Sequence, residues 1–302
     1  MRIFFGVGPG GEETELPRPA SFRFDSSEEA PADRLTAVFP LRRDCGPLPG
    51  LRVRDGAGGL LFDGPVDVLR RVSSGGGCSA VLTARSRAAL LLDSEAVPQS
   101  YDLPSLPTVY ERHIRPYGFA GWKGSGRVFA GTVTVEKGMS EWQVAARFCA
   151  EYLLTAPRVR GAVFDASGGA GREEIRFGGR GGVRCASLER RARYCDVVSD
   201  LYALSGGKYL PAAKSAEAAA LGILRTRCAA ERPEDPGAAL KTAVDAAFAV
   251  AAECPGEPRA QAGDPASLDD PFLGRAEGLV VAEVRHVWDG GGERCRYLLR
   301  RK

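Results

Sequence analysis

The chain has 302 residues, of which 41 are basic and 38 acidic, and this net charge of +3 gives no indication of a nucleic-acid or membrane partner. No apolar run approaches the roughly 20 residues that a membrane helix needs, and the N-terminal residues are too polar for a signal peptide, so we expect a cytoplasmic start. The length favours two or three units, and the 38 glycines and 20 prolines favour a β-rich, turn-rich chain.

The pattern of the first 98 residues predicts a meander of short strands. We expect strands at Arg2–Val7, Ser21–Asp25, Arg34–Leu41, Leu51–Val53, Leu60–Gly64, Val66–Val72 and Ser79–Arg85, with glycine-rich turns between them. The match of residues 6–11 to GxGxxG is interpreted as a plain loop, because a proline and several glutamates follow where a phosphate-binding helix would begin. Ser86 is a possible N-cap for a helix over residues 86–93. Residues 1–98 are therefore predicted to form a first β-barrel with a lid helix.

The clearest local signal lies in the next region, residues 99–157. A β-branched strand at Thr132–Val135 precedes Ser140, which stands three residues before Gln143 in a capping-box spacing, and an apolar helix face follows. A shorter helix is expected at Thr108–Arg115, with His113 as a partly exposed structural residue. This middle region is predicted to contain helices.

Residues 158–302 are again rich in strand patterns. Strands are expected at Val159–Phe164, Glu174–Phe177, Gly182–Ser187, Tyr194–Ala203, Leu279–Trp288 and Arg294–Arg300, the last two forming a closing hairpin. Residues 204–208 form a hairpin turn and not a phosphate loop, because Tyr202 and Tyr209 replace residues that a Walker loop needs. The alanine-rich stretches 212–230 and 237–253 are plausible helices, although the first could contain a strand at 219–227, and residues 254–271 read as a connector.

These patterns predict an α+β, β-rich fold. It would have two small antiparallel β-barrel domains, at 1–98 and 158–302, with an intervening helix-containing α/β region at 99–157 and an alanine-rich insertion at about 212–271 in the second barrel region.

No motif for catalysis or metal binding is present in the sequence. The eight cysteines are dispersed without a CxxC pair, and neither His113 nor His286 has a second ligand three or four residues away, so we predict reduced, mostly buried thiols, no metal and no cofactor. GxSxG and HExxH are absent. Acidic pairs such as Asp196 with Asp200, and the arginines between residues 184 and 193, are interpreted as solvated charge. No catalytic residue is predicted.

Four segments, LLFDGPVDVLRRVSSGGGCSAVLTARSRAALLLDSEAVP, PTVYERHIRPYGF, VTVEKGMSEWQVAARFCAEYL and VAEVRHVWDGGGERCRYLLRRK, follow one another in an order that resembles a known family. They resemble the baseplate hub, or late-control, proteins of contractile phage tails and tail-like particles. The resemblance covers roughly residues 50–165 and 275–302. It implies a virion protein assembled in the bacterial cytoplasm: a homotrimer whose two barrels per subunit form a ring between the sixfold tail tube protein and the threefold central spike protein.

A ring of this kind needs exposed anchors at subunit interfaces, and the candidates are large aromatic residues: Phe62, Trp142, Trp288 and Tyr297. Core packing is the alternative for each of them. Two other functions stay open. VEKGMSEWQVAARF also resembles the start of a LysM glycan-binding module, although Pro157 and a strand-like segment follow where a second short helix belongs, and an unrecognised peptidoglycan hydrolase is the other possibility.

Overall fold

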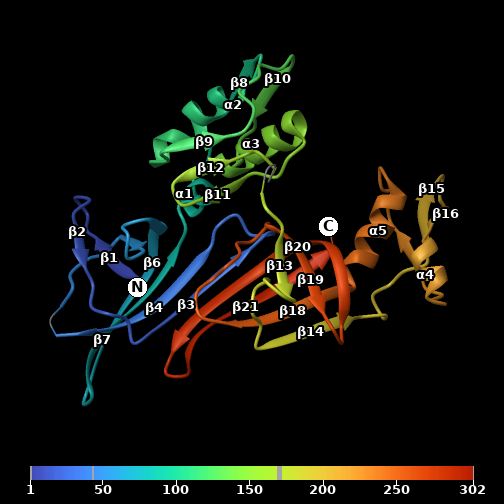
Figure 1. Cartoon of the computed structure of the whole chain (residues 1–302). Helices are drawn as coiled ribbons and strands as arrows, with labels where there is room; N and C mark the ends of the chain where they lie inside the picture. The colour runs from blue at the N-terminus through green and yellow to red at the C-terminus, as the bar shows by residue number, and fades with distance from the viewer. Residues whose placement is uncertain (1, 43, 169–171, 302) are drawn as a thin grey trace. The chain divides into compact units, whose positions relative to one another are not determined.

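The computed structural model describes residues 2–42, 44–168 and 172–301. The chain divides into unit 1, Met1–Arg172 with Arg285–Glu293, and unit 2, Glu173–Val284 with Arg294–Lys302. Strands dominate both units and helices are few, which confirms the β-rich prediction (Figure 1). The finer domain boundaries at residues 98 and 157 stay a prediction.

The sheet of unit 1 is antiparallel and follows the order β3-β4-β7-β6-β5-β1-β2. Its strands are β1 Ile3–Val7, β2 Glu13–Glu15, β3 Ser21–Ser27, β4 Arg34–Leu41, β5 Gly50–Arg54, β6 Leu60–Ser74 and β7 Gly77–Arg85. Alternate residues such as Leu35, Phe39 and Leu82 face one core, as half-buried strands require.

Strand β6 replaces two of the predicted strands. Its first part pairs with β5 and the part from Val66 onward pairs with β7, with a register shift between Val66 and Val68. The change of partner needs Gly64, because a Cβ there would lie 1.9 Å from the carbonyl oxygen of Arg85. The F-D-G sequence thus marks a point where two backbones come too close for any side chain.

The rest of unit 1 contains its helices and short strands. Figure 1 shows α2 and α3 among the short strands of this part of the chain. The elements are α1 Ala88–Asp93, β8 Gln99–Asp102, α2 Leu106–Val109, η1 Tyr110–Ile114, η2 Arg115–Tyr117, β9 Gly121–Lys123, β10 Thr132–Val135, α3 Glu141–Phe148, η3 Cys149–Leu153, β11 Arg158–Arg160 and β12 Val163–Asp165. β8 pairs with β10, and β12 lies between β11 and β9.

Two helix starts differ from their predictions. Ser86 does not cap α1, whose N-cap is Arg87 with no side-chain hydrogen bond; the Ser86 hydroxyl instead accepts the backbone N–H of Asp33 at 2.9 Å. A long-range partner therefore outcompetes the local cap. The helix expected from residue 108 begins at Leu106, because Ser105 accepts the N–H of Thr108 and the proline at 107 suits the first helical turn.

The predicted capping box of α3 is confirmed. Ser140 Oγ accepts the N–H of Gln143 at 3.2 Å, and Gln143 Oε1 accepts the N–H of Ser140 at 2.7 Å. Trp142, Val144 and Phe148 then face the core below. The strand, cap and apolar face of this unit all follow from local sequence.

Replacing Ser140 with alanine is expected to lower the free energy of unfolding by about 1 kcal/mol, because one N–H of the first turn loses its acceptor. Urea denaturation of the full chain measures this. Ser140→Thr is the matched control and should stay within about 0.5 kcal/mol of the parent, since threonine keeps the accepting oxygen. Equal losses in both variants would contradict the capping account.

Unit 2 is also rich in strands. Its elements are β13 Ile175–Gly178, β14 Ser187–Ala192, β15 Asp200–Ser205, β16 Lys208–Lys214, α4 Ala216–Ala220, β17 Thr226–Ala229, α5 Pro236–Ala246, β18 Phe248–Pro255, β19 Pro265–Asp270, β20 Gly274–Asp289 and β21 Gly292–Arg301. The order β14-β18-β21-β20 is extended by β19 and β13. The predicted closing hairpin is confirmed as β20–β21, and its tip, Arg285–Glu293, belongs to unit 1.

The alanine-rich part of unit 2 departs most from expectation. The helix predicted over 237–253 ends at Ala246, and strand β18 follows because Val250, Ala252 and Cys254 alternate into the core. Only five residues of the first stretch are helical, and the strand that forms there, β17, begins at Thr226, so most of the alternative strand expected at 219–227 is wrong. The expected connector contains β19, and no strand occupies 182–186.

The described part of the chain has no strand order that closes into a ring, so closure of either predicted barrel stays a prediction. Within the same residues, none of the helices is both long and apolar enough to cross a membrane.

Candidate interaction site

The four aromatic candidates have different environments. Phe62, Trp142 and Tyr297 are 4%, 8% and 0% exposed, and each belongs to a separate hydrophobic core. Trp288, at the end of β20, is half-buried and packs against the edge of the unit 1 core. Of the four, Trp288 is the least buried, so it is the candidate whose surface a partner could contact.

Trp288 lies in a layered contact. Its ring stacks on Phe22 with centroids 6.2 Å apart and planes at 22°, and the guanidinium of Arg18 lies 4.7 Å from the indole centroid. Stacking and cation–π contact both fix the orientation of a ring that is not enclosed. The indole is thus held in place while part of its surface stays accessible.

A charged cluster of Arg2, His286 and Glu293 also lies against Phe22. His286 meets the Phe22 ring edge-on at 4.8 Å, and its Nε2 lies 2.9 Å from Glu293 Oε1, which also accepts from Arg2 Nη1 at 2.5 Å. Burial alone would raise the pKa of Glu293, but the hydrogen bonds from Arg2 and His286 outweigh it and hold the pKa below its usual value. Sequence reasoning missed this cluster because Arg2 and His286 are 284 positions apart.

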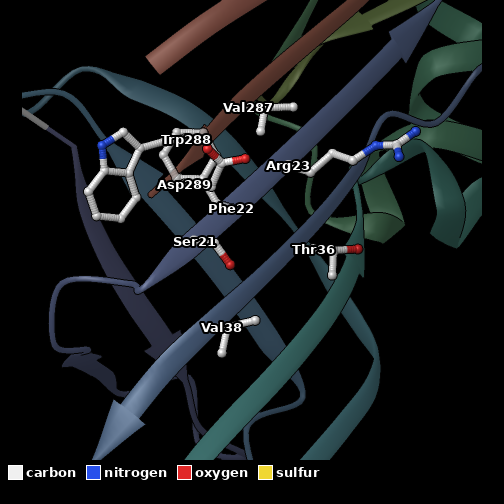
Figure 2. A pocket seen from close by; sticks show the side chains of 8 residues that line it. All are labelled: Ser21, Phe22, Arg23, Thr36, Val38, Val287, Trp288 and Asp289. Atoms are coloured by element: carbon white, nitrogen blue, oxygen red, sulfur yellow. The ribbon is translucent and has the colours of Figure 1, made fainter. Parts of the chain in front are cut away.

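A small pocket opens beside Trp288, with a volume of about 230 Å³. Figure 2 shows Ser21 and Arg23 on β3, Thr36 and Val38 on β4, and the side chains of Val287, Trp288 and Asp289 around it. Ligand pockets usually have about 300–1,000 Å³. This one suits a single inserted side chain, as at a protein–protein interface, better than a small-molecule substrate.

The motifs that carried the family resemblance meet at a second place in unit 1. Asp63 accepts from Arg87 Nε at 3.0 Å and from Arg52 Nε at 3.1 Å, while Arg87 Nη1 donates to the Tyr117 carbonyl at 3.0 Å. Arg85 pairs with Asp67 and Asp93. The F-D-G strand and the A-R-S-R-A-A-L-L-L-D segment are therefore joined by two ion-pair clusters, one around Asp63 and one around Arg85.

His113 is buried and not partly exposed as predicted. Its Nδ1 lies 2.6 Å from Glu141 Oε2, Tyr117 donates to the same carboxylate at 3.1 Å, and only 1% of the residue is exposed. The acid comes from α3, 28 positions away, which local spacing could not reveal. The contact joins η1 to the start of α3.

The raised pKa of Asp33 predicts that the stability of the protein depends on pH. Burial raises its pKa to about 6 from an ordinary value of 3.8, against smaller opposing contributions from Ser26 and Arg160. The folded protein therefore holds a proton between about pH 4 and 6 that the unfolded chain has released, so stability falls as pH rises through this window and is level above it. We expect the free energy of unfolding to fall by about 2 kcal/mol between pH 4 and pH 7. This is less than the full pKa shift of Asp33 implies, because its side chain is only half-buried.

Asp33→Asn should remove this dependence and raise the stability at pH 7 relative to the parent. Urea denaturation between pH 4 and 7.5 measures the difference, with the well-exposed Asp44→Asn as control. Parallel pH profiles for Asp33→Asn and the parent would contradict the assignment.

Neither metal ligands nor disulfides stand out at any site. The described residues contain no group of three His, Cys, Asp or Glu that could hold a metal ion. All eight cysteines are free, but only Cys149, Cys254 and Cys295 are buried, so the expectation of mostly buried thiols is wrong. Burial raises the pKa of Cys149 to about 12, which leaves it a protonated core residue.

The fold described above is shared with phage-type tail proteins. The chain matches the 43 kDa tail protein of prophage MuSo2 from Shewanella oneidensis with a TM-score of 0.74 and 13% identity, covering 100% of this chain and 98% of that one. A tail protein from Neisseria meningitidis MC58 matches with a TM-score of 0.69, 17% identity, and coverage of 100% and 97%.

A third match is the E. coli c3393 protein, described as a type VI secretion component with structural similarity to the bacteriophage T4 tail proteins gp27 and gp5. Its TM-score is 0.56 and its identity 10%, with coverage of 94% of this chain and 73% of that one. No protein-family model matches the sequence, and no curated protein matches it. At these identities the likeness is one of fold.

Proposed function

We propose that this chain is a structural hub protein of a contractile, phage-type tail baseplate. The observation that carries the proposal is a shared fold over the whole length of both the MuSo2 and the Neisseria tail proteins. The similarity of the E. coli protein to gp27 and gp5 supports a position at the hub. The motif order in the sequence points the same way independently of the fold.

In this proposal three copies form a ring, each contributing two barrel-like sheets, and the ring adapts the sixfold tail tube to the threefold spike. Trp288 is the proposed interface anchor, because it is oriented by Phe22 and Arg18 and stands beside a pocket of single-side-chain size. A closed ring needs heterologous contacts, in which an anchor on one copy meets a different surface on the next. The role is non-enzymatic, and the protein would act in the virion after assembly in the cytoplasm.

The single most informative test is solution mass by light scattering across a range of protein concentrations. A trimer of 32.1 kDa chains has a mass of about 96 kDa. Trp288→Glu should shift the population to monomer, whereas Trp288→Phe should keep the trimer because it preserves the stack. A folded protein that stays monomeric at every concentration, alone and with tube and spike proteins, would contradict the ring.

The glycan-binding alternative lacks structural support. A LysM module needs a second short helix directly after the first, but η3 simply continues α3, and the chain then enters β11. The strand that precedes α3 pairs with β8, which comes before it in the chain. Binding to purified peptidoglycan is therefore expected to be absent.

A further inference from the structure

Three cysteines gather in the core of unit 2. Cys185 precedes β14, Cys254 lies on β18, and Cys295 is its directly opposite partner on β21. The sulfur atoms of Cys185 and Cys254 are 3.4 Å apart, whereas the Cys295 thiol is directed to the carbonyl of Gly256 at 3.2 Å. One sulfur pair in this group is therefore in van der Waals contact.

The backbone brings Cys185 to the end of the β14–β18 ladder, close to Cys254. Ala186 N–H donates to the Glu253 carbonyl at 2.6 Å, and Ser187 is registered opposite Glu253. Continuation of this register would place Ala186 opposite Cys254, so Cys185 is one position out of direct opposition, and the observation that brings the two thiols together is the 3.4 Å contact between their sulfur atoms. For a disulfide to form, the distance between the two sulfur atoms must fall by about 1.4 Å, to a bond length of about 2.05 Å. Side-chain rotation can supply a movement of this size.

We propose that Cys185 and Cys254 form a redox-sensitive thiol pair that closes to an intramolecular disulfide when the protein meets a small-molecule disulfide. The two residues differ in access: Cys185 is half-buried, and Cys254 is 3% exposed. Cys185 is consequently the thiol that an oxidant reaches first, and Cys254 is the resolving thiol behind it.

The exchange proceeds in two steps with oxidised glutathione as the oxidant. The Cys185 thiolate attacks one sulfur of oxidised glutathione, forms a mixed disulfide and releases one glutathione thiolate, which takes up a proton. Cys254 then loses its proton to solvent and attacks the Cys185 sulfur, which expels the second glutathione. Two protein thiols are oxidised, and one oxidised glutathione is reduced to two glutathione molecules.

Local hydrogen bonds support this order of events. The Cys254 thiol donates to Cys185 Sγ, and the backbone N–H of Gly178 adds a further hydrogen bond, so the pKa of Cys185 is lowered despite its partial burial. A larger thiolate fraction makes Cys185 the better nucleophile at neutral pH.

The disulfide would close a long loop of the chain. Cys185 and Cys254 are 69 positions apart, and β14, β15, β16, α4, β17, α5 and β18 lie between them. The chain leaves the sheet after Ala192 and returns at Phe248, so the cross-link would join β14 and β18 at the end of the strand pair that lies away from this segment. A cytoplasmic thiol pool keeps such a pair reduced, whereas an oxidising medium closes it. The inference goes beyond the proposed function and does not depend on it.

The test uses the full chain with the three exposed cysteines, Cys78, Cys195 and Cys228, changed to serine, so that five thiols remain and intermolecular bonds are avoided. After reduction and removal of the reductant, the protein is incubated with oxidised glutathione. We expect the thiol count under denaturing conditions to fall from five to three, the mass to fall by about 2 Da, and a non-reduced digest to contain the peptides of Cys185 and Cys254 joined.

Two further variants in that background identify the pair. Cys185→Ser alters a half-buried position and should leave its four thiols unchanged after oxidation, while Cys295→Ala should still lose two of four. An unchanged count of five in the parent, a glutathione adduct retained on Cys185, or a Cys254–Cys295 link would each overturn the proposal.

Discussion

Replacing Asp63 with alanine is expected to lower the free energy of unfolding by about 3–5 kcal/mol, among the largest effects of any single polar change in unit 1. The Asp63 side chain is 8% exposed and accepts from Arg87 and Arg52. Without it, Arg87, whose side chain is 15% exposed, keeps its charge, and among the described residues the Tyr117 carbonyl is its one remaining hydrogen-bond partner. Urea denaturation followed by circular dichroism measures the loss.

Two controls separate burial from charge in this experiment. Glu111→Ala breaks an ion pair with Arg115 whose side chains are 54% and 63% exposed, and should cost about 0.5 kcal/mol or less. The double change Asp63→Leu with Arg87→Met removes both charges and should recover part of the loss. If Asp63→Ala lowers the free energy of unfolding no more than Glu111→Ala does, the ion pairs of Asp63 do not stabilise the contact between the sheet and α1.

Replacing Trp142 with alanine is expected to lower the free energy of unfolding by about 3–5 kcal/mol, with no change in the solution mass of the folded protein. Trp142 is 8% exposed and meets Phe164 edge-on with centroids 6.0 Å apart in the core beneath α3. Removing an enclosed indole leaves a cavity that the neighbouring side chains fill only in part.

Trp142→Phe is the matched control, since it keeps an aromatic ring on Phe164 and should cost less than half as much. The two measurements together distinguish core packing from an interface role. An unchanged unfolding free energy combined with a loss of trimer would assign Trp142 to a subunit contact instead.

Local sequence was sufficient wherever the structure depends on near neighbours. The capping box at Ser140, the strand Thr132–Val135 and the closing hairpin of β20 and β21 all form as predicted. Helix caps and tight turns depend on residues within a few positions of one another, so they can be predicted from the sequence alone.

Predictions failed where distant partners decide. Ser86 does not cap α1 because its hydroxyl accepts the backbone N–H of Asp33 instead. The second half of the alanine-rich stretch 237–253 becomes β18 because a neighbouring strand pairs with it on each side. Helix propensity is a weak preference, and an available ladder of backbone hydrogen bonds with a buried face overrides it.

The candidate site shows the same division. The sequence by itself determined a β-rich chain, the order of the motifs, and Trp288 as one of four candidate anchors. Only the tertiary structure decided which aromatic residues are enclosed, brought Arg2 to Glu293 and His113 to Glu141, and placed the sulfur of Cys185 beside that of Cys254. Side-chain exposure and ion pairing depend on residues that the fold brings together from far apart, and no local pattern records those distances.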